Sequence, residues 1–196
     1  MIARNIHLKI PIERVGVLIG SDGSVKETIE KNLNLSIEVN SRTGDVSITS
    51  SGPDPSLLLR ARDVILSIGR GFSPEKAFRL FDEDQNLCVI NVLEIFGTPS
   101  AVQRIKSRII GKRGRTRQLL EEETMTNISV YGNTISIIGD MEHLKVARDA
   151  IEMFIRGALH RTVYRYLNKK RSDLQKLEME IWKSTPDLKK GREKHV

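Results

Sequence analysis

Two short loops combine paired glycines with residues that could hold a phosphate group. They are Gly20-Ser-Asp-Gly23 and Gly111-Lys-Arg-Gly114, which we call the first and second glycine loops. Because glycine has no Cβ atom, such a loop can turn tightly and let a phosphodiester reach backbone N–H groups. A helix predicted to start at Gly114 would add its unpaired N–H groups and partial positive charge. Lys112 and Arg113 would add two full charges, so this pattern favours binding of a phosphate-containing chain.

The two loops differ in charge. Three further cations flank the second glycine loop and are candidate contacts for an anionic strand: Arg108, Arg115 and Arg117. The first glycine loop has four candidate contacts: Gly20, Ser21, Gly23 and Lys26. It also carries Asp22, and a like charge about 4 Å from a phosphate costs on the order of 4 kcal/mol at an effective dielectric of about 20, less when salt screens it. We therefore predict that the second loop dominates binding and that the first binds weakly or serves as a platform.

The overall charge agrees with an anionic partner. The chain has a net charge of +7, and residues 83–196 hold 21 of its 32 Lys and Arg but 15 of its 25 Asp and Glu. Seven cations lie between Arg104 and Arg117, and no acid lies between Glu94 and Glu121. Such a run can be a solvated helix face, but its overlap with the second glycine loop favours a polyanion, of which nucleic acid is the commonest.

The glycine loops belong to an internal repeat that divides the chain. The second loop follows the first at an offset of 91 residues, and Ala61-Arg-Asp-Val-Ile65 returns as Ala147-Arg-Asp-Ala-Ile151 at an offset of 86. A repeat of this length indicates two copies of one structural unit. We predict a first domain over residues 1–82, a second over 83–183, and a mobile basic tail over 184–196.

Hydrophobic periodicity gives both copies the same order of elements, βααββα. In the first copy, strands are predicted around Ile6–Ile10, Leu35–Val39 and Val46–Ile48, with helices before Gly20, after Gly23 and from about Asp54. In the second copy, strands are predicted at Leu87–Val92, Ile128–Val130 and Ile135–Ile137, with helices over 99–110, 114–123 and 142–155. Each copy gains an extra helix, about Pro74–Phe81 in the first and about Leu159–Trp182 in the second. The fold class is therefore α+β.

The sequence offers little for catalysis or metal binding. Its single cysteine, Cys88, excludes an intramolecular disulfide and a cysteine-based zinc site, and it is expected to be a small core residue. The four histidines are scattered, and Glu121–Glu123 point around a helix rather than at one spot. We therefore expect no catalytic residue, no metal and no cofactor. No apolar stretch is long enough to span a bilayer, and we expect a cytoplasmic protein without a membrane partner.

An Ile-Gly-x-x-Gly turn between two helices, followed by a β-hairpin, resembles the type I KH domain of RNA-binding proteins. Both copies carry this turn, as Ile19–Gly23 and Ile110–Gly114. The resemblance implies two tandem KH domains, each with a three-stranded antiparallel sheet covered by helices on one face, plus a long C-terminal helix. It also implies that single-stranded RNA is clamped by the loop. Bases would then lie in an apolar groove, for which the candidates are Ile110, Leu119, and Ile128 or Val130.

Two tandem KH copies, each closed by an Ala-Arg-Asp segment, are similar to the archaeal members of the partner-of-Nob family. The resemblance implies a non-enzymatic factor that binds the 3′ end region of small-subunit ribosomal RNA. It implies the Nob endonuclease and the ribosomal RNA dimethyltransferase as protein partners. Two alternatives remain: a KH-fold scaffold for protein interactions with incidental RNA contact, and an RNA-decay cofactor.

Overall fold

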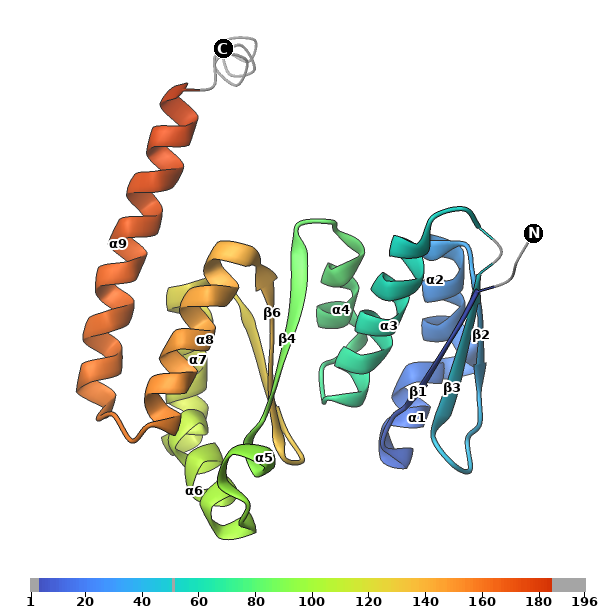
Figure 1. Ribbon diagram of the computed structural model, residues 1–196, viewed down its shortest axis with the longest axis horizontal. Coiled ribbons are helices and arrows are strands. Elements are labelled where there is room, and N and C mark those ends of the chain that lie inside the picture. Colours follow the sequence, from blue (N-terminus) through green and yellow to red (C-terminus); the bar gives the residue numbers. More distant parts are fainter. Residues whose placement is uncertain (1–3, 51, 185–196) are drawn as a thin grey trace.

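The computed structural model describes residues 4–50 and 52–184. It contains two three-stranded antiparallel sheets, arranged one after the other along the molecule with helices packed on them (Figure 1). We call the two sheet-and-helix units the first module and the second module. The predicted α+β fold with tandem copies and a long C-terminal helix is confirmed.

The first module follows the predicted element order. Its sheet has the strand order β1-β3-β2, and Ile6 of β1 lies opposite Ile48 of β3 in the register. The elements are β1 (Arg4–Lys9), α1 (Ile12–Ile19), η1 (Ser21–Gly23), α2 (Ser24–Leu33), β2 (Ser36–Val39), β3 (Asp45–Ser50), α3 (Pro55–Gly69), α4 (Pro74–Ala77) and η2 (Phe78–Phe81).

The second module repeats this order with one addition. Its sheet has the strand order β4-β6-β5. The elements are β4 (Gln85–Asn91), α5 (Val92–Phe96), α6 (Pro99–Ile110), η3 (Lys112–Gly114), α7 (Arg115–Thr124), β5 (Asn127–Tyr131), β6 (Thr134–Asp140), α8 (Met141–Ile155) and α9 (His160–Ser184). The placement of Val92 in a strand was wrong, because Asn91 caps the short helix α5 by accepting a hydrogen bond from the backbone N–H of Leu93 at 3.2 Å.

The helix that closes each sheet begins after an aspartate. Asp54 accepts a hydrogen bond from the backbone N–H of Ser56 at 2.8 Å, and Asp140 accepts one from His143 at 3.1 Å. Such caps satisfy N–H groups that the first helical turn leaves unpaired. The helices α3 and α8 are thereby fixed at equivalent points, and each packs its apolar face into the core of its own module.

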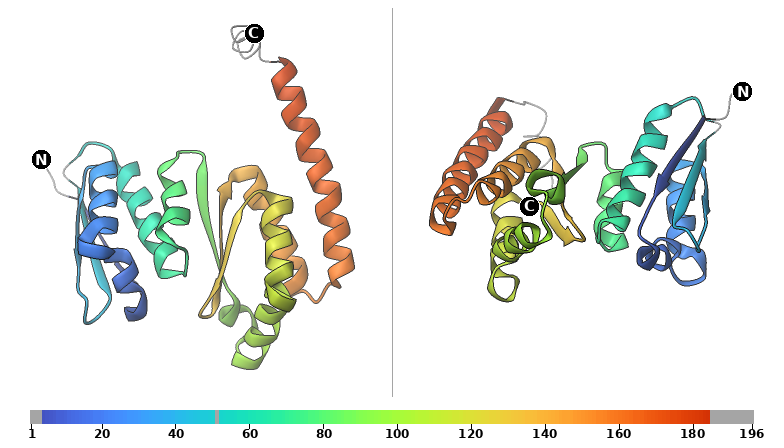
Figure 2. Two further views of the ribbon diagram at one scale, coloured as in Figure 1. Left: turned by 180° about the vertical axis from the view of Figure 1, so that it is seen from behind. Right: turned by 60° about the horizontal axis from the view of Figure 1, so that its bottom comes forward.

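The two modules pack against each other through the second sheet. Ile138 of β6 is fully buried within the core of the first module, and Leu87 of β4 packs against that core. The extra segment α4–η2 of the first module thus lies on one face of the second sheet, and the helices of the second module lie on the other face (Figures 1 and 2). The prediction that helices cover one face holds for the first sheet, whose outer residues Asn5, His7 and Lys9 are exposed. The helices of the second module also cover one face of its sheet, as predicted; the other face is covered by the first module, which the sequence did not predict.

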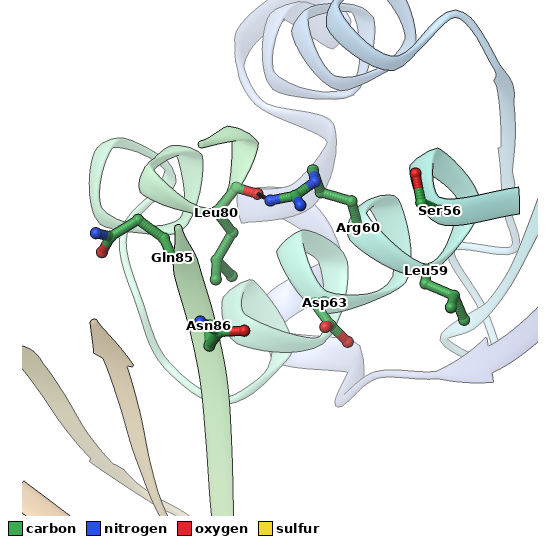
Figure 3. Close-up of a pocket in the computed structure, with 7 residues that line it drawn as sticks. All are labelled: Ser56, Leu59, Arg60, Asp63, Leu80, Gln85 and Asn86. Atoms are coloured by element: carbon green, nitrogen blue, oxygen red, sulfur yellow. Dashed lines mark hydrogen bonds between the residues drawn. The ribbon is translucent and has the colours of Figure 1, made fainter. Parts of the chain in front are cut away.

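The connection between the modules is held by α3. The Arg60 guanidinium donates a hydrogen bond to the carbonyl oxygen of Leu80 at 2.9 Å (Figure 3). It donates another to the carbonyl oxygen of Asp82. The boundary predicted at residue 82 falls in this connection, between η2 and β4, and the division into separate folding domains stays a prediction. Of the predicted tail, residue 184 ends α9 and residues 185–196 lie outside the described residues.

Cys88 lies on the edge strand β4 and is half-buried rather than sealed in the core. Burial raises the pKa of its thiol, so the protonated form is favoured at neutral pH. Within residues 4–50 and 52–184, no helix combines the length and apolar character needed to cross a membrane.

Candidate nucleic-acid interface

The two glycine loops have the same backbone conformation. Gly20 and Gly111 have φ/ψ of 76°/179° and 71°/177°, while Gly23 and Gly114 have 81°/7° and 79°/4°. The third loop residue also has a positive φ in both copies, 52° at Asp22 and 56° at Arg113. The two loops therefore present nearly the same backbone to a ligand, and they differ in the side chains placed on it.

The paired glycines serve different purposes. A Cβ atom on Gly111 would lie 2.1 Å from Oγ1 and 2.9 Å from the backbone N of Thr116, so the loop packs directly on the first turn of α7. A Cβ atom on Gly114 would meet no atom within 4 Å. Position 114 thus favours glycine because its backbone is left-handed, not because space is short. The outer side of Gly114 is open for a ligand to approach.

Three cations in or directly after the second glycine loop are free to meet a ligand. Lys112, Arg113 and Arg115 are exposed, and no hydrogen bond or ion pair with another described residue engages their side chains. Arg117 is also exposed, with a long ion pair of 3.7 Å between its Nε and Oε2 of Glu121. Arg117 itself is 44% exposed and the separation is long, so this pair is weak and Arg117 can turn to an anion at little cost.

Arg108 is held away from the loop. Its guanidinium donates hydrogen bonds to the carbonyl oxygens of Phe154, at 3.1 Å, and of Ala158, and it lies 5.6 Å from the centre of the Phe154 ring. The Phe154 carbonyl lies in the last turn of α8, where a cation complements the helix dipole, and Ala158 lies in the connection to α9. We therefore exclude Arg108 from the candidate RNA contacts and assign it a structural role.

Arg14 of α1 does the same in the first module. It donates to the carbonyl oxygens of Ile68, at 2.8 Å, and Phe72, at 2.5 Å, which lie 86 residues before the acceptors of Arg108. Each module thus holds the end of the helix that closes its sheet, α3 or α8, with an arginine from the helix before its glycine loop, α1 or α6.

The predicted groove residues lie at different depths. Ile110, Leu119 and Val130 are half-buried and keep apolar surface beside the loop. Ile128 is only 2% exposed and lies in the core opposite Ile137, so its side chain supports the groove from below. Val130 is therefore the better placed of the two strand candidates.

The first glycine loop lacks an exposed cation. Ser21 and Asp22 are exposed, and Lys26 forms an ion pair of 3.5 Å with Glu30 on the same helix. The Glu30 carboxylate also accepts a hydrogen bond from the backbone N–H of Ile37 at 2.7 Å, which holds it in place. The side chains on this loop therefore favour phosphate far less than those on the second loop.

Sequence reasoning missed the contacts between the C-terminal helix and the two helices that flank the second glycine loop, α6 and α7. His160 Nε2 lies 3.2 Å from the carbonyl oxygen of Arg108, and the Tyr164 hydroxyl lies 3.3 Å from Oγ1 of Thr116. Both partners lie within five residues of the loop. The signal available in the sequence was weak, since aromatic residues on a helix usually serve packing.

The first module contacts the back of the strand that lines the groove. Tyr131 of β5 donates a hydrogen bond to Glu13 at 2.7 Å, and Ser129 donates one to the carbonyl oxygen of Arg70 at 2.8 Å. The hydrogen bond from Tyr131 is the main cause that lowers the pKa of Glu13. Because side chains alternate along a strand, Ser129 and Tyr131 face the first module while Val130 faces the groove.

Among the residues that the structure describes, no cluster of three or more His, Cys, Asp or Glu could hold a metal ion. The candidate site consists of a cationic loop beside apolar side chains. Such a site can bind and orient a polyanion.

Comparison with known proteins identifies the family. A family model described as eukaryotic type KH-domain (KH-domain type I), the second KH domain of PNO1, matches residues 86–172. A KH domain-containing protein of Methanocaldococcus jannaschii is 41% identical over 189 residues, which cover 95% of this chain and 83% of that protein. The pre-rRNA-processing protein PNO1 of Saccharomyces cerevisiae is 25% identical over 80% of this chain and 59% of its own length.

A solved structure agrees with these relatives. The a/eIF2alpha-aDim2p-rRNA complex from Pyrococcus horikoshii OT3 contains a chain that is 45% identical, with a TM-score of 0.81, and the match covers 87% of this chain and 96% of that one. The resemblance stated from the sequence is therefore confirmed. The chain belongs to the PNO1/Dim2 family of RNA-binding, non-enzymatic KH-domain proteins.

Proposed function

We propose that this protein binds single-stranded RNA through the second glycine loop and acts as an assembly and processing factor for the 3′ end region of small-subunit ribosomal RNA. The observation that carries the binding proposal is the exposed cationic loop, open on the side of Gly114. The ribosomal assignment draws on the relatives, one named for pre-rRNA processing and one solved in a complex with rRNA.

In this proposal the loop holds the sugar-phosphate chain and the groove holds the bases. Lys112 and Arg113 attract the phosphate, and the N-terminus of α7 adds its partial positive charge at the same point. The apolar surfaces of Ile110, Leu119 and Val130 then contact base faces. Phosphate contacts set the position of the strand, and groove contacts set its sequence preference.

The first module acts mainly as a platform. Asp22 occupies the position equivalent to Arg113 on an identical backbone, so a phosphate there would meet a negative charge. Residual contact through Gly20, Ser21 and Gly23 is compatible with this role. We propose that the protein partners of this chain are the Nob endonuclease, the ribosomal RNA dimethyltransferase and a protein of the a/eIF2alpha type.

The test places a glutamate at equivalent positions of the two loops, Lys112 and Ser21. Lys112→Glu is expected to weaken binding of a short single-stranded RNA by about tenfold or more, equivalent to about 1.4 kcal/mol or more. Ser21→Glu, the matched change in the first loop, is expected to leave binding within about twofold, since that loop already carries Asp22. Fluorescence anisotropy at several salt concentrations measures both variants.

Two outcomes contradict the proposal. Equal losses in the two variants would refute the dominance of the second loop. Shallow salt dependence, with Lys112→Glu unchanged, would favour the protein-scaffold alternative. Crosslinking the protein to cellular RNA tests the ribosomal assignment separately, because a map without enrichment near the small-subunit 3′ end would remove it.

A further inference from the structure

We propose that the exposed cationic face of α9 is a second RNA-backbone contact that begins beside the second glycine loop. This face is formed by Arg161, Arg165, Lys169 and Lys176. It would bind the part of the RNA that flanks the segment held in the groove. The inference rests on the proposed function and extends its binding surface.

The four cations share one side of the helix. At 3.6 residues per turn, positions 161, 165, 169 and 176 fall within an arc of about 80° and extend over about 22 Å of helix. All four side chains are exposed. The opposite side carries Val163 and Leu167, which are buried at 0% and 1% exposure in the core of the second module. The cations therefore point away from the body of the protein.

The segment 161–176 of α9 carries a large excess of positive charge. Residues 161–176 hold six Lys and Arg and one acid, Asp173, although the whole chain has a net charge of only +7. Of the six, Arg171 pairs with Glu123 at 3.1 Å and Lys170 is half-buried. The four cations of the exposed face form no hydrogen bond or ion pair with other described residues. They are available to an external anion.

The position of α9 connects this face to the glycine loop. The contacts from His160 to Arg108 and from Tyr164 to Thr116 set the start of α9 beside the loop. Further along, the pair between Arg171 and Glu123 keeps α9 next to α7, and the two helices run side by side (Figure 2). Arg161 and Arg165 each follow one of these two contact residues in sequence, so we expect an RNA strand that leaves the loop and passes around α9 to meet them first.

The composition of this face favours nucleic acid over a protein partner. From position 160 to 176, the side chains that the structure describes as exposed are all polar or charged. The centre of a protein interface is normally apolar and poor in charge. A polyphosphate chain instead needs dispersed cations, and it gains affinity by releasing counterions from its backbone.

The test compares a short RNA that fills only the groove, about four to six nucleotides, with a longer RNA that extends beyond it on both sides. The variant combines Arg161→Gln, Arg165→Gln and Lys169→Gln. If all three contact phosphates, the salt slope for the longer RNA falls by about 2 and its affinity about 50-fold at 0.15 M salt, taking 1 M as the reference. Binding of the short RNA is expected to stay unchanged.

A control variant combines Lys9→Gln, Lys31→Gln and Arg42→Gln, three exposed positions of the first module that remove the same net charge. It should bind both RNAs like the natural sequence, and thermal unfolding checks that both variants are folded. The inference is overturned if the α9 variant loses no more affinity for the longer RNA than the control, or if it loses affinity for both RNAs equally. Failure of the natural sequence to bind the short RNA would instead refute the proposed function.

Discussion

The two glycines of the second loop should fail in different ways when each is replaced by alanine. Gly111→Ala puts a Cβ atom 2.1 Å from Oγ1 and 2.9 Å from the backbone N of Thr116. Its φ of 71° and ψ of 177° also lie in a region that is essentially restricted to glycine. Gly114→Ala meets no atom within 4 Å and has an ordinary left-handed conformation.

These geometries give different costs. For Gly111→Ala, backbone strain of about 1–3 kcal/mol adds to an overpacking cost of about 1–3 kcal/mol, so we expect a loss of about 2–6 kcal/mol in the free energy of unfolding. For Gly114→Ala only the left-handed strain remains, and we expect about 1–2 kcal/mol. The added methyl group of Gly114→Ala lies on the open side of the loop, where it would obstruct a phosphate.

Urea unfolding of the full chain, followed by far-ultraviolet circular dichroism, measures stability, and fluorescence anisotropy with a short RNA measures affinity. Gly111→Ala should lose more stability, while Gly114→Ala should stay folded and bind RNA about tenfold more weakly, or about 1.4 kcal/mol. The first loop offers an internal replicate, since a Cβ on Gly20 would lie 2.6 Å from Val25 Cγ2 and one on Gly23 would meet nothing. Equal destabilisation by both alanines of either loop would refute the division of roles.

Two further predictions concern the surroundings of the loop. Glu121 accepts a hydrogen bond from the backbone N–H of Ile128 at 2.8 Å, so Glu121→Ala should destabilise the protein by about 1–3 kcal/mol in urea unfolding. The control is Glu122→Ala on the exposed side of α7, which should change stability by less than about 0.5 kcal/mol. The hydrogen bond from Tyr131 lowers the pKa of Glu13, so it stabilises the packed modules above the ordinary pKa of a glutamate and ceases to do so as the pH falls through the lowered value. Tyr131→Phe should therefore raise the pKa of Glu13 in a carbon-13 NMR titration, and an unchanged value would contradict the assigned cause.

The order of elements and the glycine loops were predictable because they depend on local sequence. Alternation along Ile6, Leu8 and Ile10 indicates a half-buried strand, and the repeat at an offset of 91 residues doubles the evidence for each element. The loop conformation follows from the glycines themselves, since φ values near 70° to 80° are readily adopted only by that residue.

The packing of the modules was harder to predict because it depends on contacts between distant residues. One signal was present: Ile137 and Ile138 are consecutive apolar residues of β6, and both are fully buried in the structure. A strand that buries neighbouring residues has both faces covered, as in the interior of a layered protein. Sequence alone could not identify α4 and η2 as the covering elements.

The cations near the loop were separable only by three-dimensional structure. Arg108 and Arg113 are five residues apart in sequence, yet one binds the end of α8 and the other is exposed. Positive charge in a sequence attracts carbonyl oxygens as well as phosphates. The number of cations in the run therefore overestimated the number available to RNA.

The arginines that hold the ends of α3 and α8 show where the two copies differ. Their acceptors are related by 86 residues, but the arginines themselves, Arg14 and Arg108, are 94 residues apart, whereas the loops are offset by 91. A fixed offset from Arg14 leads to Ile105, a buried core residue. Equivalent residues of the two copies should therefore be identified by the atoms that their side chains contact. Equivalence by sequence offset would pair the structural cation Arg14 with the hydrophobic residue Ile105.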